Sequence, residues 1–493
     1  MTRAVQIHPE DTVAVALQTL HADETVSAGG AQIHIQQEIP RGHKFALCEI
    51  KPGDTVVKYG CVIGEAYAAV EPGQWVHVHN LKTRLAGKQQ YTYHPVATDL
   101  PPSKPQTFRG YLREDGRAGV RNEIWIIPTV GCVNGCVKAL EAQNQHLVRG
   151  SIDGIHAFTH PYGCSQNDAD LEQTAQLLTA LAKHPNAGAV LMVGLGCEFL
   201  THEKLLERLG PYPKERLMFL TCQEAEDEIA EGSAMLEKLA EYASTFHRQE
   251  LPASKLVVGL KCGGSDGLSG ITANPVVGAF SDLLVAQGGS SILCEVPEMF
   301  GAEQLLMNRC ASEAVFEKTT KLINDYKSYL IGHGEGLSDN PSPGNLDGGI
   351  TTLEDKSCGC IQKGGKAVVA DVLRYGEQLH TAGLNLLYGP GNDLVSATAE
   401  AASGAQIILF TTGRGTPFGC AVPTMKIATN AELAEKKSKW IDFDASVVLR
   451  GSSLVEAGER LFDAVLKTAD GAPTCAERLG YRQIAIFKDG VTL

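Results

Sequence analysis

Cysteines follow several short apolar stretches of this chain, at positions where a metal or a substrate could reach them. The chain has 14 cysteines, and six stand directly after such a stretch: Cys132, Cys164, Cys197, Cys222, Cys262 and Cys294. Stretches of this kind are typical of buried parallel strands, and ligands of open α/β sheets bind beyond the carboxyl ends of the strands. Thiolates from separate strand ends can hold a soft metal ion or an iron–sulfur cluster. We therefore predict Cys132, Cys164 and Cys197 as metal ligands, with packing as small apolar side chains as the alternative.

The spacing of the cysteines argues against two familiar thiol sites. Cys132 and Cys136 are four positions apart and Cys358 and Cys360 are two apart, so neither pair has the ligand spacing of a zinc ribbon. A dithiol redox function would need a Cys-x-x-Cys motif, which the sequence lacks. Two versions of the site stay open: an iron–sulfur cluster on the cysteines, and a single Fe(II) ion held by histidines and carboxylates.

Residues suited to acid–base chemistry lie in four further segments. His43 and Lys44 are adjacent, and a neighbouring cation lowers an imidazole pKa and keeps the ring available as a base. His77 and His79 are two apart, so on a strand they would face the same side. We predict catalytic roles for His43, Lys44, Asp266 and Glu298, and substrate binding by His77, His79, Ser265 and Arg414. Surface histidines, a glycine-rich turn and helix-terminal charges are the structural alternatives.

The composition indicates a folded protein and argues against nucleic acid and membrane partners. Of 493 residues, 43% are hydrophobic and 20% charged, as in ordinary globular proteins. The formal net charge of -14 repels phosphate backbones and anionic lipid surfaces. The first twenty residues do not read as a signal peptide, so we expect a cytoplasmic protein with free or metal-bound cysteines. No glycine motif has the spacing of a nucleotide-binding loop.

The chain divides into a β-rich part and a larger α/β part. Residues 1–95 alternate short apolar stretches with glycine and proline turns, which predicts a small β-rich domain. Residues 96–108 are rich in proline and polar side chains, as in a linker. Apolar runs then alternate with helical patterns, which predicts a doubly wound α/β region in two units, 109–250 and 251–493. The expected strands lie within 124–130, 155–158, 189–195, 217–220, 256–260, 292–293 and 407–410.

The longest motifs of the chain resemble those of the altronate/galactarate dehydratase family. They extend over nearly the whole sequence and include Gly-His43-Lys44, His77-Val-His79-Asn, Pro-Thr-Val-Gly-Cys132, Tyr-Gly-Cys164-Ser-Gln, Gly-Leu-Gly-Cys197-Glu, Cys262-Gly-Gly-Ser265-Asp266, Glu295-Val-Pro-Glu298 and Thr-Thr-Gly-Arg414. The resemblance implies an SAF-like N-terminal domain followed by a large catalytic region. It also implies dehydration of D-altronate to 2-dehydro-3-deoxy-D-gluconate in hexuronate breakdown, with iron as the cofactor.

Such a reaction removes the C2 proton and the C3 hydroxyl of a sugar acid, and a bound metal would stabilise the enediolate. We expect His43 or His79 to complete the cysteine site across a domain interface. The motifs do not separate stereoisomers, so dehydration of another aldonate or aldarate such as galactarate, and a sulfolactate sulfo-lyase activity, stay as alternatives. A sugar-acid-binding regulator or an electron-carrying iron–sulfur protein could use the same residues. The expected partners are a small sugar acid and further copies of the chain.

Overall fold

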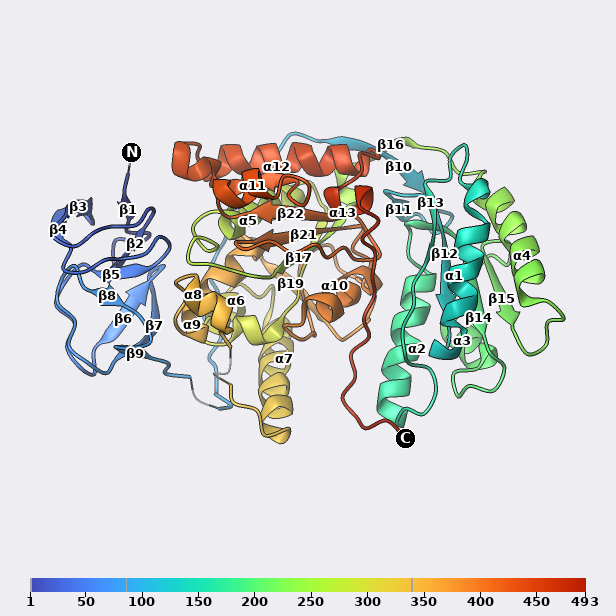
Figure 1. The fold of residues 1–493 in the computed structure, drawn as a ribbon, viewed down its shortest axis with the longest axis horizontal. Coiled ribbons are helices and arrows are strands. Elements are labelled where there is room, and N and C mark those ends of the chain that lie inside the picture. The colour runs from blue at the N-terminus through green and yellow to red at the C-terminus, as the bar shows by residue number, and fades with distance from the viewer. Residues whose placement is uncertain (1, 86, 338–339) are drawn as a thin grey trace.

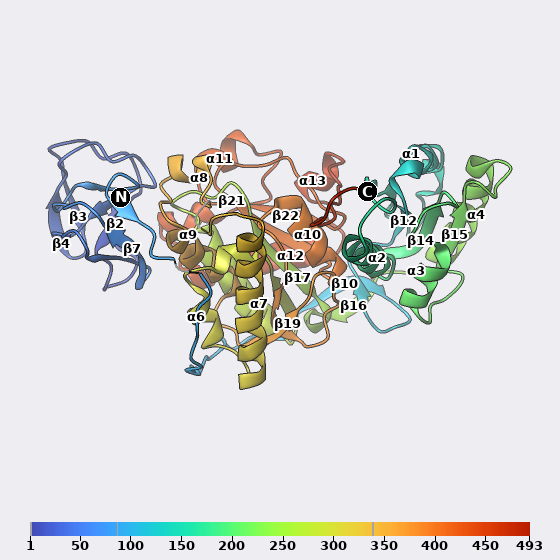
Figure 2. The same ribbon diagram turned by 90° about the horizontal axis from the view of Figure 1, so that it is seen from below.

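The computed structural model describes residues 2–85, 87–337 and 340–493. They form three domains in a row (Figure 1), with the N-terminal domain at one end, the second domain at the other and the C-terminal domain between them. The view from below shows the same order (Figure 2). The C-terminal domain contacts both neighbours, through helix α9 (Leu353–Cys360) on the N-terminal side and helix α10 (Asp393–Ala402) on the other.

The N-terminal domain consists of short antiparallel strands. In β3 the exposed and buried residues alternate, so Val26 and Ala28 point into the core while Thr25 and Ser27 face solvent. Gly29 and Gly30 have positive φ angles and form the turn to β4. The strands are β1 Ala4–Val5, β2 Val13–Ala16, β3 Thr25–Ala28, β4 Ala31–His34, β5 Lys44–Ala46, β6 Thr55–Lys58, β7 Cys61–Ala66, β8 Trp75–Val76 and β9 Leu81–Lys82. The prediction of a small β-rich domain is confirmed.

The second domain is a four-stranded parallel sheet in the order β13-β12-β14-β15. Its strands are β12 Glu123–Pro128, β13 Gly154–Ala157, β14 Ala187–Gly194 and β15 Leu217–Thr221. Helices α1 Asn134–Gln143 and α4 Glu228–Ala243 cover one face, and α2 Asp168–Ala182 and α3 His202–Leu209 cover the other. Coverage on both faces explains the nearly continuous apolar runs of these strands.

The C-terminal domain is built on a seven-stranded parallel sheet in the order β19-β20-β18-β17-β21-β22-β23. The strands are β17 Val257–Cys262, β18 Ser290–Leu293, β19 Val369–Leu373, β20 Gly383–Leu387, β21 Ile407–Thr412, β22 Thr424–Ala428 and β23 Phe443–Asp444. After β17 the chain adds β18, β19 and β20 on one side of this strand, and then adds β21, β22 and β23 on its other side. The strand order therefore reverses at β17, where open α/β sheets bind their ligands.

Helices cover both faces of this larger sheet, so the predicted doubly wound α/β architecture is confirmed. Helices α5 Ala273–Ala286 and α12 Leu454–Ala469 pack on one face, and α10 Asp393–Ala402 packs on the other. The remaining helices are α6 Glu303–Met307, α7 Glu313–Gly332, α8 Pro343–Asp347, α9 Leu353–Cys360, α11 Ala431–Lys436 and α13 Cys475–Arg478.

The second and C-terminal domains are joined by a paired ribbon and a shared core. Strand β10 Thr107–Leu112 pairs with β16 Gln249–Pro252 and with the short β11 Ala118–Gly119, so both predicted unit boundaries, at 109 and 250, fall on paired strands. Apolar residues of α2 and α10 belong to one hydrophobic cluster. Across the described ranges of the chain, no helix is long and apolar enough to cross a membrane.

Candidate metal centre and active site

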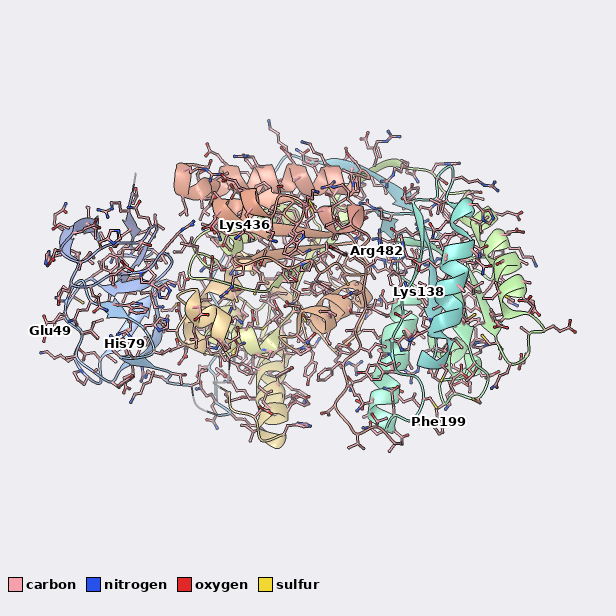
Figure 3. All side chains as sticks on the ribbon, in the orientation of Figure 1. Glu49, His79, Lys138, Phe199, Lys436 and Arg482 are labelled. Carbon is pink, nitrogen blue, oxygen red and sulfur yellow. The ribbon has the colours of Figure 1, made fainter. Side chains whose placement is uncertain are left out.

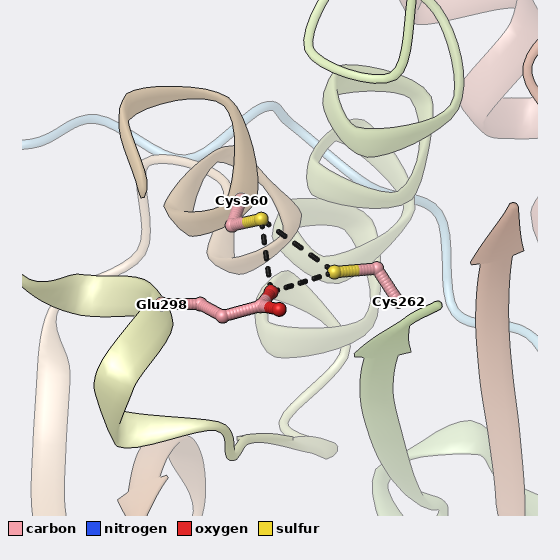
Figure 4. A group of neighbouring side chains, drawn as sticks. All are labelled: Cys262, Glu298 and Cys360. Carbon is pink, nitrogen blue, oxygen red and sulfur yellow. Dashed lines mark hydrogen bonds between the residues drawn. The ribbon is translucent and has the colours of Figure 1, made fainter. Parts of the chain in front are cut away.

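Two cysteines and a glutamate converge where the strand order of the C-terminal sheet reverses (Figure 4). Cys262 Sγ lies 2.9 Å and Cys360 Sγ 3.0 Å from the same Glu298 carboxylate oxygen. The two sulfur atoms are 3.5 Å apart. All three side chains are buried, which removes them from competition with bulk water.

Each of these three residues is positioned by a different element. Cys262 is the last residue of β17. Glu298 lies on a 3₁₀ turn, Val296–Met299, that follows β18. Glu295 opens that turn with a φ of 67°, and its carboxylate accepts hydrogen bonds from the backbone N–H of Cys262 and from Lys261. Cys360 ends helix α9, whose first turn is capped by the Thr352 hydroxyl.

Buried lysines balance the negative charge of this cluster. Lys356 Nζ is 2.7 Å from the second carboxylate oxygen of Glu298. Burial by itself would raise the pKa of Glu298, but the ammonium groups of Lys356 and Lys363 hold it well below the usual range. The hydrogen-bond contact between Cys360 and Cys262, together with burial, raises the pKa of Cys360 well above that of a free thiol. In the metal-free chain, Cys360 is therefore a neutral thiol that donates to the Glu298 carboxylate.

The donor set fits a single soft or borderline metal ion. A tetrahedral ion with metal–sulfur bonds of about 2.3 Å places two thiolates roughly 3.8 Å apart, close to the 3.5 Å between Cys262 and Cys360. Two thiolates and one carboxylate leave a coordination position for a substrate, as in catalytic sites. Fe(II) is among the ions that such mixed sulfur and oxygen ligands accept. Cys262, Glu298 and Cys360 thus form a candidate metal group. Of these three, only Glu298 is among the site residues predicted from the sequence.

A cavity of about 640 Å³ opens onto this group. That volume is within the range of small-molecule sites. Polar residues from five segments line it, among them Cys262, Glu298, Ser342, Asn345, Lys356, Asn392 and Asp393. Asp393, at the start of α10, lies 3.1 Å from Lys261 and keeps 34% of its side chain exposed. The cavity therefore presents a cation at Lys356 and an accessible carboxylate at Asp393 beside the candidate metal group.

Helix α9 connects the metal group to the N-terminal domain. Its Asp355 carboxylate lies 2.8 Å from Lys44 Nζ and 3.0 Å from Lys58 Nζ, and all three side chains are buried. Burial lowers the pKa of Lys44 to about 8, although the Asp355 charge acts in the opposite direction. Lys44 also donates to the carbonyl of Gly349 at 2.8 Å. Lys44 is therefore held in an ion triad between two domains.

The predicted histidines contact the main chain just before α9. Trp75 Nε1 donates to His43 Nδ1 at 3.2 Å, so His43 Nε2 carries the ring proton and donates to the carbonyl of Asp347 at 3.1 Å. His77 Nε2 lies 3.1 Å from the carbonyl of Leu346. Burial lowers the pKa of both rings, that of His77 to about 4, so both are neutral near pH 7.

His79 is exposed, and Figure 3 shows it on the N-terminal domain, far from Phe199 at the other end of the molecule. Phe199 follows Cys197 by two residues. Within one chain, His79 therefore cannot complete a site that contains Cys197. The predicted closure of the cysteine site by an N-terminal histidine does not occur within a single chain.

The other predicted binding residues surround the same main-chain segment, residues 344–349. The Ser265 carbonyl accepts a hydrogen bond from Asn345 at 2.9 Å, and Arg414 donates to the Gly344 carbonyl at 2.9 Å. Asp266 accepts from Thr429 Oγ1 at 2.9 Å, and burial raises its pKa. The structure thus brings six of the predicted residues together around this segment: His43, Lys44, His77, Ser265, Asp266 and Arg414.

Cys132, Cys164 and Cys197 lie in the second domain, after β12, β13 and β14. Cys132 and Cys197 are exposed and Cys164 is half-buried. Their three sulfur atoms do not all lie within 4.8 Å of one another; in the described ranges, the group of Cys262, Glu298 and Cys360 is the one that meets that limit. These cysteines are therefore a separate feature from the cavity.

Sequence reasoning missed Cys360 of the metal group and two residues that line the cavity, Lys356 and Asp393. Asp393 had a usable signal, because Gly389-Pro-Gly-Asn-Asp393 is a turn-rich stretch after the apolar β20. Cys360 and Lys356 lie on a short helix that enters from a distant part of the chain. Their spacing, a lysine four residues before the cysteine, places both on one helix face.

Three family models match the chain in succession. The altronate/galactarate dehydratase SAF domain matches residues 2–84, the second domain of D-galactarate dehydratase/altronate hydrolase matches residues 110–244, and the C-terminal domain of D-galactarate/altronate dehydratase matches residues 253–492. These ranges correspond to the three domains of the fold.

Curated relatives match over nearly full length. The chain is 50% identical to the altronate dehydratase of Escherichia coli (strain K12), with 99% of each chain covered. It is 50% identical to the altronate dehydratase of Bacillus subtilis (strain 168), with both chains fully covered. The galactarate dehydratase (L-threo-forming) of Escherichia coli is 34% identical, with 98% of this chain and 96% of that relative covered. The chain therefore belongs to the altronate/galactarate dehydratase family.

Proposed function

We propose that this chain is a hydro-lyase that converts D-altronate to 2-dehydro-3-deoxy-D-gluconate in hexuronate breakdown, with iron as its metal. The 50% identity to two altronate dehydratases supports this substrate over galactarate, whose dehydratase is 34% identical. The location of the active site rests on one observation: the cavity at β17 opens where Cys262, Glu298 and Cys360 meet. Sulfolactate cleavage is an alternative that sulfite release would reveal.

The chemistry requires loss of a weakly acidic C2 proton and of the C3 hydroxyl. An Fe(II) ion held by Cys262, Glu298 and Cys360 would act as a Lewis acid near the substrate carboxylate and lower the energy of the enediolate. The surrounding residues must then bind the carboxylate and move the proton.

We assign these two tasks to Lys356 and Asp393. Lys356 is 9% exposed and lines the cavity, so its ammonium group can bind the substrate carboxylate. Asp393 accepts the C2 proton, and Lys261 at 3.1 Å fixes the orientation of its carboxylate. The proton then passes to the departing C3 hydroxyl, which leaves as water, and the resulting enol ketonises to the 2-keto product.

The predicted residues of the N-terminal domain act as positioning residues in this proposal. His43 and Lys44 hold segment 344–349 and helix α9, which carries Lys356 and Cys360. Arg414, half-exposed beside Gly344, and Asp266 and Ser265 border the same segment. His77, whose ring contacts the Leu346 carbonyl of that segment, and the exposed His79 both stay predicted substrate-binding residues.

The proposal is tested by incubating the anaerobically purified protein with Fe(II) and D-altronate and measuring the 2-keto-3-deoxy product. Asp393→Asn should abolish turnover while metal content stays unchanged. Asp371→Asn, at an exposed ion pair with Lys318, is the matched control. No product from D-altronate would refute the function, and full turnover of Asp393→Asn would refute the assignment of the base. A cytoplasmic location and a homo-oligomeric state stay predictions, to be tested by fractionation and light scattering.

A further inference from the structure

The cysteines of the second domain are more exposed than those of the C-terminal domain. All seven cysteines after residue 250 are buried. The five cysteines of the second domain are exposed or half-buried: Cys132, Cys136, Cys164, Cys197 and Cys222. A free cysteine is among the most buried residue types, so partly open thiols at one edge of one sheet are not explained by packing.

These five cysteines lie at the carboxyl edge of the sheet, at its switch point. The chain builds β12, places β13 on one side, and then crosses to the other side with β14 and β15. Cys132, Cys164, Cys197 and Cys222 follow these four strands in turn. The edge therefore has the location of a ligand site in an open parallel sheet.

A glycine directly precedes each of three of these cysteines, at Gly131, Gly163 and Gly196. Gly163 has a φ of +102°, and a Cβ atom there would lie 2.0 Å from the Thr129 carbonyl oxygen. Gly196 has a φ of +120°, and its Cβ would lie 2.9 Å from the Gln223 side chain. The glycines therefore allow the cysteine loops to approach one another more closely than other residues could.

Cross-loop hydrogen bonds fix these loops together. The backbone N–H of Gly131 donates to the Tyr162 carbonyl at 2.8 Å, which joins the loops of Cys132 and Cys164. The buried Glu198 carboxylate accepts from Thr129 Oγ1 at 2.6 Å, which joins the loops of Cys132 and Cys197. Gln223 Nε2 approaches Cys197 Sγ at 3.8 Å. These hydrogen bonds preorganise the loops.

The arrangement of Cys132, Cys164 and Cys197 argues against one shared metal ion as their ligand. A single ion with bonds of about 2.3 Å would need its thiolates roughly 3.8 Å apart, and Cys132, Cys164 and Cys197 do not all lie within 4.8 Å. An iron–sulfur cluster is larger than one ion and takes thiolates that stand further apart. Cys136, in α1, and Cys222, directly after β15, form a pair of thiols whose sulfur atoms are 4.0 Å apart.

We propose that the carboxyl edge of the second domain is an iron–sulfur cluster site with Cys132, Cys164 and Cys197 as protein ligands. The cluster is separate from the metal ion of the cavity at β17, and its presence does not depend on which sugar acid the enzyme dehydrates. Three thiolate ligands leave one iron of a four-iron cluster without a cysteine ligand, available to a small ligand or a partner surface.

The test uses the full chain, reconstituted anaerobically with ferrous ion and sulfide in the presence of a thiol reductant. Acid-labile sulfide per chain and visible charge-transfer absorption are measured after desalting. The wild type should retain stoichiometric sulfide, and Cys132→Ser, Cys164→Ser and Cys197→Ser should each lose it. Cys48→Ser, exposed in the N-terminal domain, and Cys475→Ser, buried in the C-terminal domain, are the controls.

Cys360→Ser separates this proposal from the proposed function, because it should remove dehydration while sulfide is retained. A wild-type protein without stoichiometric sulfide would overturn the cluster whether or not any variant folds. Equal sulfide loss in the Cys48→Ser control, or full retention in the three ligand variants, would overturn the assigned ligands.

Discussion

Replacing Asp355 with asparagine tests how the N-terminal domain supports the cavity. Asp355 shares its carboxylate between Lys44 and Lys58, and the three side chains are 0–1% exposed. Asp355→Asn leaves two buried ammonium groups without a counter-charge. Removing one partner of a buried ion pair costs roughly 3–5 kcal/mol, and at about 1.4 kcal/mol per tenfold this equals roughly 100- to 4,000-fold more frequent local opening.

The measurement is hydrogen exchange of the backbone amides of α9, residues 353–360, followed by mass spectrometry. The control is Asp371→Asn, which breaks an exposed pair with Lys318 and should change the free energy of opening by less than about 1 kcal/mol. Equal exchange rates of α9 in the two variants would refute the reasoning.

The same ion triad predicts a dependence on pH. Burial opposes ionisation of Asp355, but Lys44 and Lys58 hold its pKa well below the usual range. The unfolded carboxyl has a pKa of about 3.9. The stabilisation is therefore complete above that pH and is lost as the pH falls below it, because the unfolded state then binds the proton first. The opening constant of α9, which is the measured exchange rate divided by the intrinsic rate at each pH, should rise below this pH in the wild type, and Asp355→Asn should remove that rise.

Three further predictions concern other parts of the molecule. The pKa of His77 falls to about 4 in the folded chain, below its unfolded value of about 6.5, so protonation of the ring between these values should loosen segment 344–349. Amide exchange of this segment, relative to the intrinsic rate at each pH, should therefore rise from pH 7 to pH 5, and His77→Gln should flatten that rise. Lys356→Met should raise KM for the sugar acid more than it lowers kcat, because a cation that binds the carboxylate is lost; the reverse pattern would contradict that role. Gly163→Ala should destabilise the second domain by more than roughly 1 kcal/mol, seen as a lower thermal midpoint, because its Cβ would lie 2.0 Å from a carbonyl oxygen.

Much of the fold could be predicted from the apolar runs of the sequence. The runs at 124–130 and 189–195 became β12 and β14, because strands covered on both faces have few polar residues. Strands β19 and β20 were not expected, since Asp371 and Asn385 interrupt their apolar character. The Asn385 side-chain NH2 group donates to the carbonyls of Thr381 and Gly383. Such local compensation is invisible in a hydrophobic pattern.

The candidate site could be predicted only in part. Glu298 was found because it follows a strand end, where the topology gathers ligands. Cys360 was not, because the end of α9 reaches Cys262 through tertiary packing that no sequence spacing encodes. His43 and Lys44 have the residue types of catalytic groups, yet their polar atoms are bound to the main chain and to Asp355. Residue type predicts chemistry only when the polar atoms are free to meet a substrate.

We propose that dehydration takes place at the metal group of Cys262, Glu298 and Cys360, beside the cavity at β17. The most direct test of this proposal compares metal content and D-altronate turnover on the same anaerobic samples of wild type, Cys360→Ser and Cys48→Ser. The account predicts that Cys360→Ser loses the metal of the cavity and at least roughly 100-fold in turnover, while Cys48→Ser retains both. Wild-type turnover of Cys360→Ser with unchanged metal content would contradict it.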